Sequence, residues 1–271
     1  MIRIVRLVVV TVITLSASVG YGQETPQRVL IPVQTTEPIP GVNGSSWTTD
    51  LWVSNGGASI VNVFGVAWDC LLPECGLSPA PVDPGRSFQP VLLGEEGALH
   101  GEILYVGPEG ADRLGFGLRF RDLSRQAENW GTEIPVPRET AFHSSAFSLV
   151  DVPVTEGFRQ TLRVYEIDGT PREASVRVRV FRLDPSGNQP VGAADTLLGE
   201  TTVPLSFAPL FGTQPLHPGY AEVTDLSTLA PLGDAERLRL EIEPATDGLA
   251  LWAFVTVIHD ETQHATVITP Q

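Results

Sequence analysis

The sequence predicts an all-β protein in which two antiparallel β-sandwiches follow one another behind a signal peptide. Short apolar or alternating segments recur between clusters of Gly, Pro, Asn and Asp, as is typical of strands and turns. No stretch of about twelve or more residues keeps a helical period between capping residues. The pattern of segments also occurs twice, and the chain of 271 residues has a length typical of about two domains.

Residues 1–22 are expected to be a secretory signal peptide. Two arginines precede the apolar run from Leu7 to Leu15, and small residues precede an expected cleavage before Gln23. The apolar run is far shorter than the roughly 20 residues that a membrane-spanning helix needs. The mature protein is therefore expected to be secreted or periplasmic, with no membrane span after cleavage.

The charge balance argues against nucleic acid as a partner. The chain has 17 basic and 32 acidic residues, a formal charge of −15, whereas proteins that bind nucleic acid concentrate positive charge to displace counterions. The same acidic balance disfavours docking on an anionic membrane.

The predicted strands share a length of about four to ten residues and a turn signal at each end. Arg237–Ile242 alternates strictly, which is typical of a half-buried strand, whereas Leu249–Ile258 is apolar on both faces and is expected to be covered on both sides. The predicted segments are Val29–Val33, Trp47–Val53, Ile60–Trp68, His100–Val106, Leu114–Phe120, Thr132–Val136, Phe147–Val152, Phe158–Tyr165, Ser175–Leu183, Tyr220–Val223, Arg237–Ile242, Leu249–Ile258 and His264–Thr269.

An internal repeat sets the expected domain organisation. Trp47–Val53 and Phe158–Val164 share the frame aromatic-x-x-x-Leu-x-Val, and a Val-x-Val strand follows each of them at Val61 and Val176. Chance similarity between valine-rich strands is the alternative. The order of the matching segments predicts one sandwich in residues 23–138 and a second in residues 139–271, each of a common domain size.

The first copy carries a motif with a family resemblance. The run from Leu51 to Gly57 (LWVSNGG), followed by Val61-Asn-Val63, resembles a signature of secreted bacterial β-sandwich modules of the immunoglobulin-like and fibronectin-III-like kind. The mature chain as a whole also resembles exported proteins of high-GC bacteria. The resemblance implies a tandem Ig-like fold and an extracellular setting, but a fold does not imply a function.

The two cysteines are expected to form a disulfide. Cys70 and Cys75 enclose a short loop, and an exported protein enters an oxidising compartment. A structural zinc site would need about four nitrogen or sulfur ligands, and no second cysteine pair exists.

One polar cluster could hold a metal ion. His259, Asp260, Glu261 and His264 are expected in a turn between the last two strands, where two imidazoles and a carboxylate could bind Zn²⁺ or Ca²⁺. The cluster is not an H-E-x-x-H motif on a helix, so a solvated turn is the other interpretation. The chain has no G-x-S-x-G elbow and no phosphate-binding glycine loop, and no catalytic residue is assigned.

Two tryptophans are candidate ligand-binding residues. Trp47, Leu51 and Val53 share one face by the period of two, so Trp52 points to the other face, where the second copy has Arg163, expected to lie in water. Trp130 belongs to a segment that has no counterpart in the second copy. Exposed aromatic rings stack on sugars or anchor protein partners. Packing of Trp52 under a loop or against the other domain is the alternative.

The sequence therefore favours an exported, non-catalytic structural, adhesive or binding protein, with a protein or glycan partner and no cofactor. The alternative is a metal-binding protein or a metal-dependent hydrolase that uses the His259/His264 hairpin.

Overall fold

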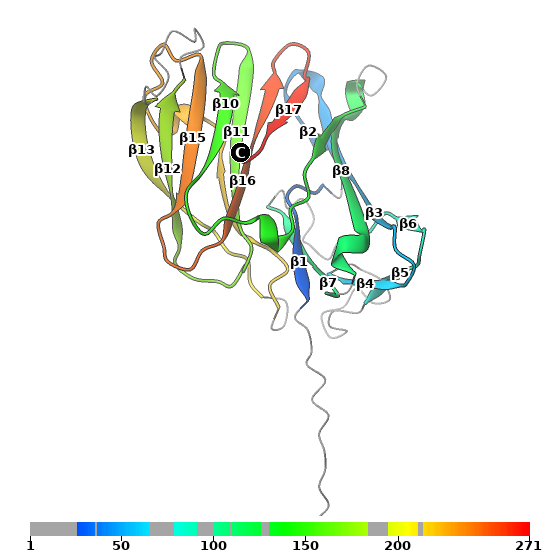
Figure 1. Cartoon of the computed structure of the whole chain (residues 1–271). Coiled ribbons are helices and arrows are strands. Elements are labelled where there is room, and N and C mark those ends of the chain that lie inside the picture. The colour runs from blue at the N-terminus through cyan, green and yellow to red at the C-terminus, as the bar shows by residue number, and fades with distance from the viewer. Residues whose placement is uncertain are drawn as a thin grey trace, which may run out of the picture.

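The computed structural model describes residues 26–35, 37–65, 79–90, 100–108, 110–125, 130–183, 195–210 and 214–271. The expected signal peptide and the pair Cys70 and Cys75 lie outside these residues. The all-β class is confirmed, because the described residues form antiparallel strands and short 3-10 turns and contain no α-helix (Figure 1). The part of the chain that the structure describes also has no helix with the length and hydropathy needed to cross a bilayer.

The strands follow the predicted segments, with four additional ones. Their bounds are β1 (Gln27–Ile31), β2 (Ile39–Pro40), β3 (Ser46–Asn55), β4 (Val61–Phe64), β5 (Ala80–Val82), β6 (Ser87–Phe88), β7 (Glu102–Val106), β8 (Leu114–Asp122), β9 (Thr132–Ile134), β10 (Phe147–Pro153), β11 (Phe158–Glu166), β12 (Ser175–Arg182), β13 (Thr196–Pro204), β14 (Gly219–Val223), β15 (Arg237–Pro244), β16 (Leu251–His259) and β17 (Ala265–Ile268). The 3-10 turns are η1 (Val42–Gly44), η3 (Ala111–Arg113), η4 (Leu123–Arg125), η5 (Glu139–Ala141) and η6 (Leu226–Thr228).

These strands form four sheets, two from each half of the chain. The first half (β1–β9) forms one sheet in the order β1-β7-β4-β5 and one in the order β2-β3-β8-β9, with β6 also paired to β3. The second half (β10–β17) forms sheets in the orders β10-β15-β12-β13 and β14-β11-β16-β17. The strand order is the same in the two halves. The sheet β1-β7-β4-β5 corresponds strand by strand to β10-β15-β12-β13, and the path β6-β3-β8-β9 corresponds to β14-β11-β16-β17.

The register of the paired strands also repeats. Leu51 on β3 lies opposite Leu118 on β8, and Leu162 on β11 lies opposite Val255 on β16. Strand β1 lies beside β7, and β10 lies beside β15, so neither first strand pairs with the next long strand of its half (β3 or β11), which differs from the A-B-E-D and C-F-G grouping of an immunoglobulin constant domain. The likeness to immunoglobulin domains therefore extends to the sandwich architecture but not to the strand order.

Each half packs its two sheets around apolar side chains that alternate along the strands. In the second half, Val176, Val178 and Val180 of β12 are fully buried and belong to the same cluster as Leu162 and Val164 of β11, in the other sheet. Alternation places every second residue on the inner face, where burial of the valine and leucine side chains stabilises the sandwich by roughly 1.5–3 kcal/mol each.

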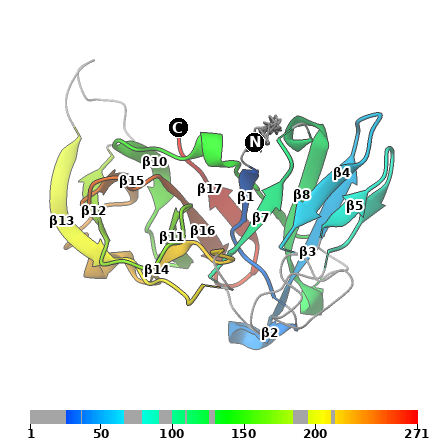
Figure 2. The same ribbon diagram turned by 90° about the horizontal axis from the view of Figure 1, so that it is seen from below.

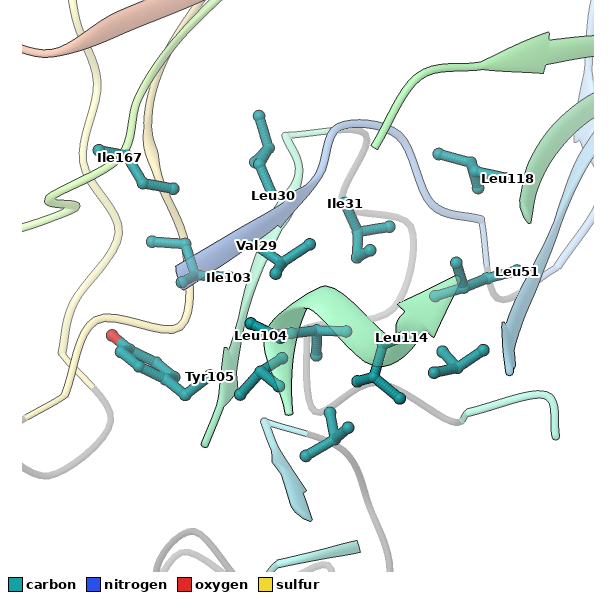
Figure 3. Close-up of a cluster of buried hydrophobic side chains, with 14 of the residues drawn as sticks. Val29, Leu30, Ile31, Leu51, Ile103, Leu104, Tyr105, Leu114, Leu118 and Ile167 are labelled. Atoms are coloured by element: carbon teal, nitrogen blue, oxygen red, sulfur yellow. The ribbon is translucent and has the colours of Figure 1, made fainter. Parts of the chain in front are cut away.

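The first half has an apolar cluster that continues into the second half. Figure 3 shows Leu104 pointing toward Leu114 inside the first sandwich, while Ile103 and Tyr105, its neighbours on β7, point to the side of Ile167. Figures 1 and 2 place β1 and β7 next to β16 and β17 in the middle of the molecule. One face of the β1-β7-β4-β5 sheet therefore packs inside the first sandwich, and the other face, at β1 and β7, packs on the second half.

The second half contributes an aromatic face to this junction. Tyr165, Trp252 and Phe254 are at most 4% exposed and belong to the cluster of Leu30 and Ile103 in the first half. The expectation that β16 is covered on both sides is confirmed, because Leu251, Ala253 and Val255 on its other face lie in the core of the second sandwich. These residues follow the predicted strand at every second position.

Hydrogen bonds cross the junction as well. The hydroxyl of Tyr165 donates to the carbonyl oxygen of Pro32, and the hydroxyl of Tyr105 donates to the carbonyl oxygen of Pro215 at 2.6 Å. The backbone N–H of Ile103 donates to the carbonyl oxygen of Leu216 at 2.7 Å. Burial raises the pKa of the Tyr105 hydroxyl to about 12, against the positive charge of Arg28, which lowers it. Both buried phenols are thus satisfied as donors, as buried polar groups require.

Arg163 lies in the junction, so the expectation that it lies in water is wrong. Its side chain is 13% exposed, its guanidinium binds Glu222 at 3.0 Å, and its guanidinium carbon lies 5.8 Å from the ring centroid of Phe254. The sequence indicated its face of the sheet correctly, but its ion pair with Glu222 and its position over Phe254, a ring of the junction, leave little of the side chain in contact with solvent.

Candidate binding site

The outer face of the β2-β3-β8-β9 sheet carries two exposed tryptophans. Trp52 on β3 is 49% exposed, and Trp130, just before β9, is 67% exposed. An exposed indole face is unusual on a sheet, because burial of such a large ring is a strong stabilising contribution. A function for these two side chains therefore needs a geometric argument.

Both tryptophans line the same pocket, which has a volume of about 210 Å³. Strands β3, β8 and β9, together with Trp130 two residues before β9, supply its lining, which consists of Asp50, Trp52, Gly117, Leu118, Arg119, Trp130 and Glu133. The two tryptophans are 78 positions apart in the sequence (130 − 52). The sheet brings them together because β8 pairs with both β3 and β9.

A glycine keeps the pocket open. Gly117 is the partner of Trp52 in the β3–β8 register, and a Cβ atom built on it would meet no atom within 4 Å. At the corresponding position of the second half, Arg163 is paired with Phe254, a ring of the junction. The first half thus has an empty position where the second half has a packing aromatic, which leaves space beside the indole of Trp52.

An ion pair supports the second tryptophan. The guanidinium of Arg121 binds the carboxylate of Asp50 at 2.7 Å, and its central carbon lies 5.1 Å from the ring centroid of Trp130. The Arg121 side chain is only 14% exposed. A cation held over an indole ring at this distance attracts the ring, so Asp50 and Arg121 hold Trp130 at the edge of the pocket.

Two further charged groups face the pocket. Arg119 and Glu133 lie directly opposite each other on β8 and β9. Arg119 donates a long hydrogen bond of 3.5 Å to the carbonyl oxygen of Gly131, and the Glu133 side chain has no partner among the described residues. A guanidinium with free donors and a carboxylate with free acceptors can bind the hydroxyl groups of a ligand that lies against the indoles.

The predicted metal ligands form a hairpin turn with other partners. The backbone N–H of His259 donates to the carbonyl of His264 at 3.0 Å, which closes the turn between β16 and β17. The Nδ1 atom of His259 accepts a hydrogen bond from the backbone N–H of Glu261 at 3.3 Å, and the carboxylate of Asp260 binds Arg159 at 2.6 Å. Within the described ranges, no group of three or more His, Cys, Asp or Glu side chains is placed to hold a metal ion.

Sequence reasoning identified Trp52 and Trp130 as candidates but missed the residues between them. The glycines of Leu114-Gly-Phe-Gly-Leu118 are the signal that could have indicated a hollow, because glycine inside a strand leaves space for a ligand or another backbone. The role of Arg121 has no such signal, since its partner Asp50 lies on another strand and 71 positions away (121 − 50).

Comparison with known proteins adds little to this geometry. No protein-family model and no curated protein matches the chain. One solved structure, the partial N-terminal region of an enterococcal surface protein, aligns over 95% of this chain and 98% of its own, with 9% identity and a TM-score of 0.21. A similarity at that level supports no inference about function, so the pocket carries the functional argument.

Proposed function

We propose that the chain is an exported, non-catalytic binding protein whose ligand is a glycan held between Trp52 and Trp130. The observation that carries the proposal is the joint position of the two exposed indoles on a single hollow, next to the guanidinium of Arg119, which keeps free donors, and the carboxylate of Glu133. The C–H face of a sugar ring packs on an indole, and its hydroxyl groups bind polar side chains at the rim.

The comparison between the halves favours a glycan over a protein partner. In the second half, the corresponding face docks on a sheet through Tyr165, Trp252 and Phe254. In the first half, the positions of Trp252 and Phe254 are taken by Gly115 and Gly117, according to the register of the paired strands. A face built to dock a second sheet needs filled, complementary packing, whereas this one is hollow.

The rest of the molecule would serve as a rigid frame for that face. We divide the mature chain near residue 138 into two sandwich domains, residues 23–138 and 139–271, following the repeated strand order. Residues 1–22 would direct the chain to the periplasm or the cell exterior. A frame with a large apolar junction keeps the binding face in a fixed orientation.

The double substitution Trp52→Ala and Trp130→Ala is expected to abolish glycan binding while leaving the melting temperature nearly unchanged. Both indoles are exposed, and surface substitutions usually change stability by less than about 0.5 kcal/mol. A glycan array probed with the wild type and the variant measures the first effect, and thermal unfolding measures the second. Binding that persists at the wild-type level in the variant would rule out this site.

A second substitution fills the pocket without removing either tryptophan. Gly117→Leu should reduce glycan binding at least tenfold, because the new side chain occupies the space beside Trp52 and meets no atom at its Cβ. Gly107→Leu is the matched control, since Gly107 also has no atom within 4 Å of a built Cβ and lies outside the pocket lining. Titration calorimetry with a glycan found on the array gives both affinities, and equal affinities would contradict the assignment of the pocket.

A further inference from the structure

We infer that the pocket between Trp52 and Trp130 takes a single, uncharged sugar ring, an inference that rests on the proposed function and narrows its ligand class. The volume of about 210 Å³ is the first reason. Pockets that enclose drug-sized ligands span about 300–1,000 Å³. This smaller space admits one ring between the indoles, while the adjoining units of a longer glycan would lie outside it.

The charge of the lining is the second reason. Asp50 lies in the lining, but its carboxylate is engaged by Arg121 at 2.7 Å. Arg121 is in turn the cation beneath Trp130. A ligand that recruited either charge would break this pair and release the indole that it needs for stacking. The pair is therefore part of the wall and adds no net charge to the site.

The remaining two charges oppose each other. Arg119 and Glu133 are direct partners in the β8–β9 register, so a ligand that reaches one also lies near the other. An acidic sugar would gain from Arg119 and lose against Glu133, and an amino sugar would experience the reverse. An uncharged ring gains from both, because its hydroxyl groups donate to the carboxylate and accept from the guanidinium.

The electrostatic field of the whole chain adds to this discrimination against acidic ligands. The formal charge of −15 gives a negative potential around the molecule. Anionic glycans would be repelled at low ionic strength, and that repulsion would be screened over a Debye length of about 8 Å at physiological salt. An uncharged sugar ring does not experience this repulsion, so its affinity for the pocket should depend little on salt concentration.

The test compares four probes on the full protein by saturation-transfer NMR and titration calorimetry. The probes are methyl β-glucopyranoside, methyl β-galactopyranoside, glucuronic acid and glucosamine. We expect at least one neutral glycoside to bind at least tenfold more tightly than both charged sugars, with less than a twofold change in affinity between 50 and 500 mM salt. We also expect its trisaccharide to gain less than threefold over the single ring.

Two charge variants test the cause. Glu133→Gln removes the only free carboxylate among the described residues of the lining and should improve the relative affinity for glucuronic acid about tenfold, whereas Arg119→Gln should improve that for glucosamine. A charged sugar that binds the wild type best, or a tenfold gain for each added ring, would overturn the inference. If either of these results were obtained but Trp52→Ala still abolished the sugar binding, only the inference of a single uncharged ring would fail, and the proposed function would stand. Absence of binding by every glycan probe would reject both.

Discussion

Phe254→Ala is expected to lower the free energy of unfolding by about 3–5 kcal/mol, the usual cost of removing a fully buried phenylalanine. Phe254 is 0% exposed and lies in the junction, with ring centroids 5.5 Å from Trp252 and 6.2 Å from Tyr165. Its removal also uncovers the guanidinium of Arg163, which lies over its ring. Urea denaturation followed by far-UV circular dichroism measures the loss.

The position of Phe254 gives a second expected result, in the other half of the chain. Because the ring belongs to the cluster that contains Leu30 and Ile103, its removal should lower the amide protection of β1 and β7 in hydrogen exchange. Val178→Ala is the control, because Val178 is equally buried but belongs to the core of the second sandwich alone. Unchanged protection of β1 and β7 in Phe254→Ala would show that the halves are energetically independent.

Gly101→Ala is expected to destabilise the protein by roughly 2–5 kcal/mol, the sum of backbone strain and overpacking. Gly101 has a φ of +83°, and an added Cβ would lie 2.9 Å from Cε1 of Tyr165 and 3.1 Å from the carbonyl oxygen of Ile31. The Tyr165 ring has little freedom to move away, because it is fully buried and its hydroxyl is bonded to Pro32.

Gly157→Ala separates the two contributions to this loss. Gly157 has a nearly equal φ of +89°, but a Cβ built on it meets no atom within 4 Å. The control should therefore cost only the left-handed backbone conformation, about 1–2 kcal/mol. Equal free energies of unfolding for the two variants would show that the junction accommodates the methyl group, and that its packing around Tyr165 is loose.

The strands of the core could be predicted because burial leaves a period in the sequence. Val176, Val178 and Val180 on β12 are buried while the arginines between them are half-buried, which is the alternation that the sequence displays. Strand β13 was missed for the opposite reason. It lies at the edge of its sheet and its residues are exposed or half-buried throughout, so no face imposes an apolar pattern.

The candidate site could be predicted in part. The period of two indicated correctly that Trp52 points away from the core, and the extra segment in the first copy indicated Trp130. The pairing of Asp50 with Arg121, and the space above Gly117, depend on which strands are neighbours in the sheet. Neighbour relations between β3, β8 and β9 arise from long-range pairing, which leaves no local signature.

The sequence by itself determined the all-β class, the repeated order of strands and the outward direction of Trp52, because each follows from a local period or from the comparison of two segments. Only the tertiary structure decided that the side chain of Arg163 is mostly covered, at 13% exposed, while Trp52 is 49% exposed, although both occupy the same position in their copies. The reason is physical contact: the second half packs that face on β1 and β7, and the first half leaves the equivalent face uncovered.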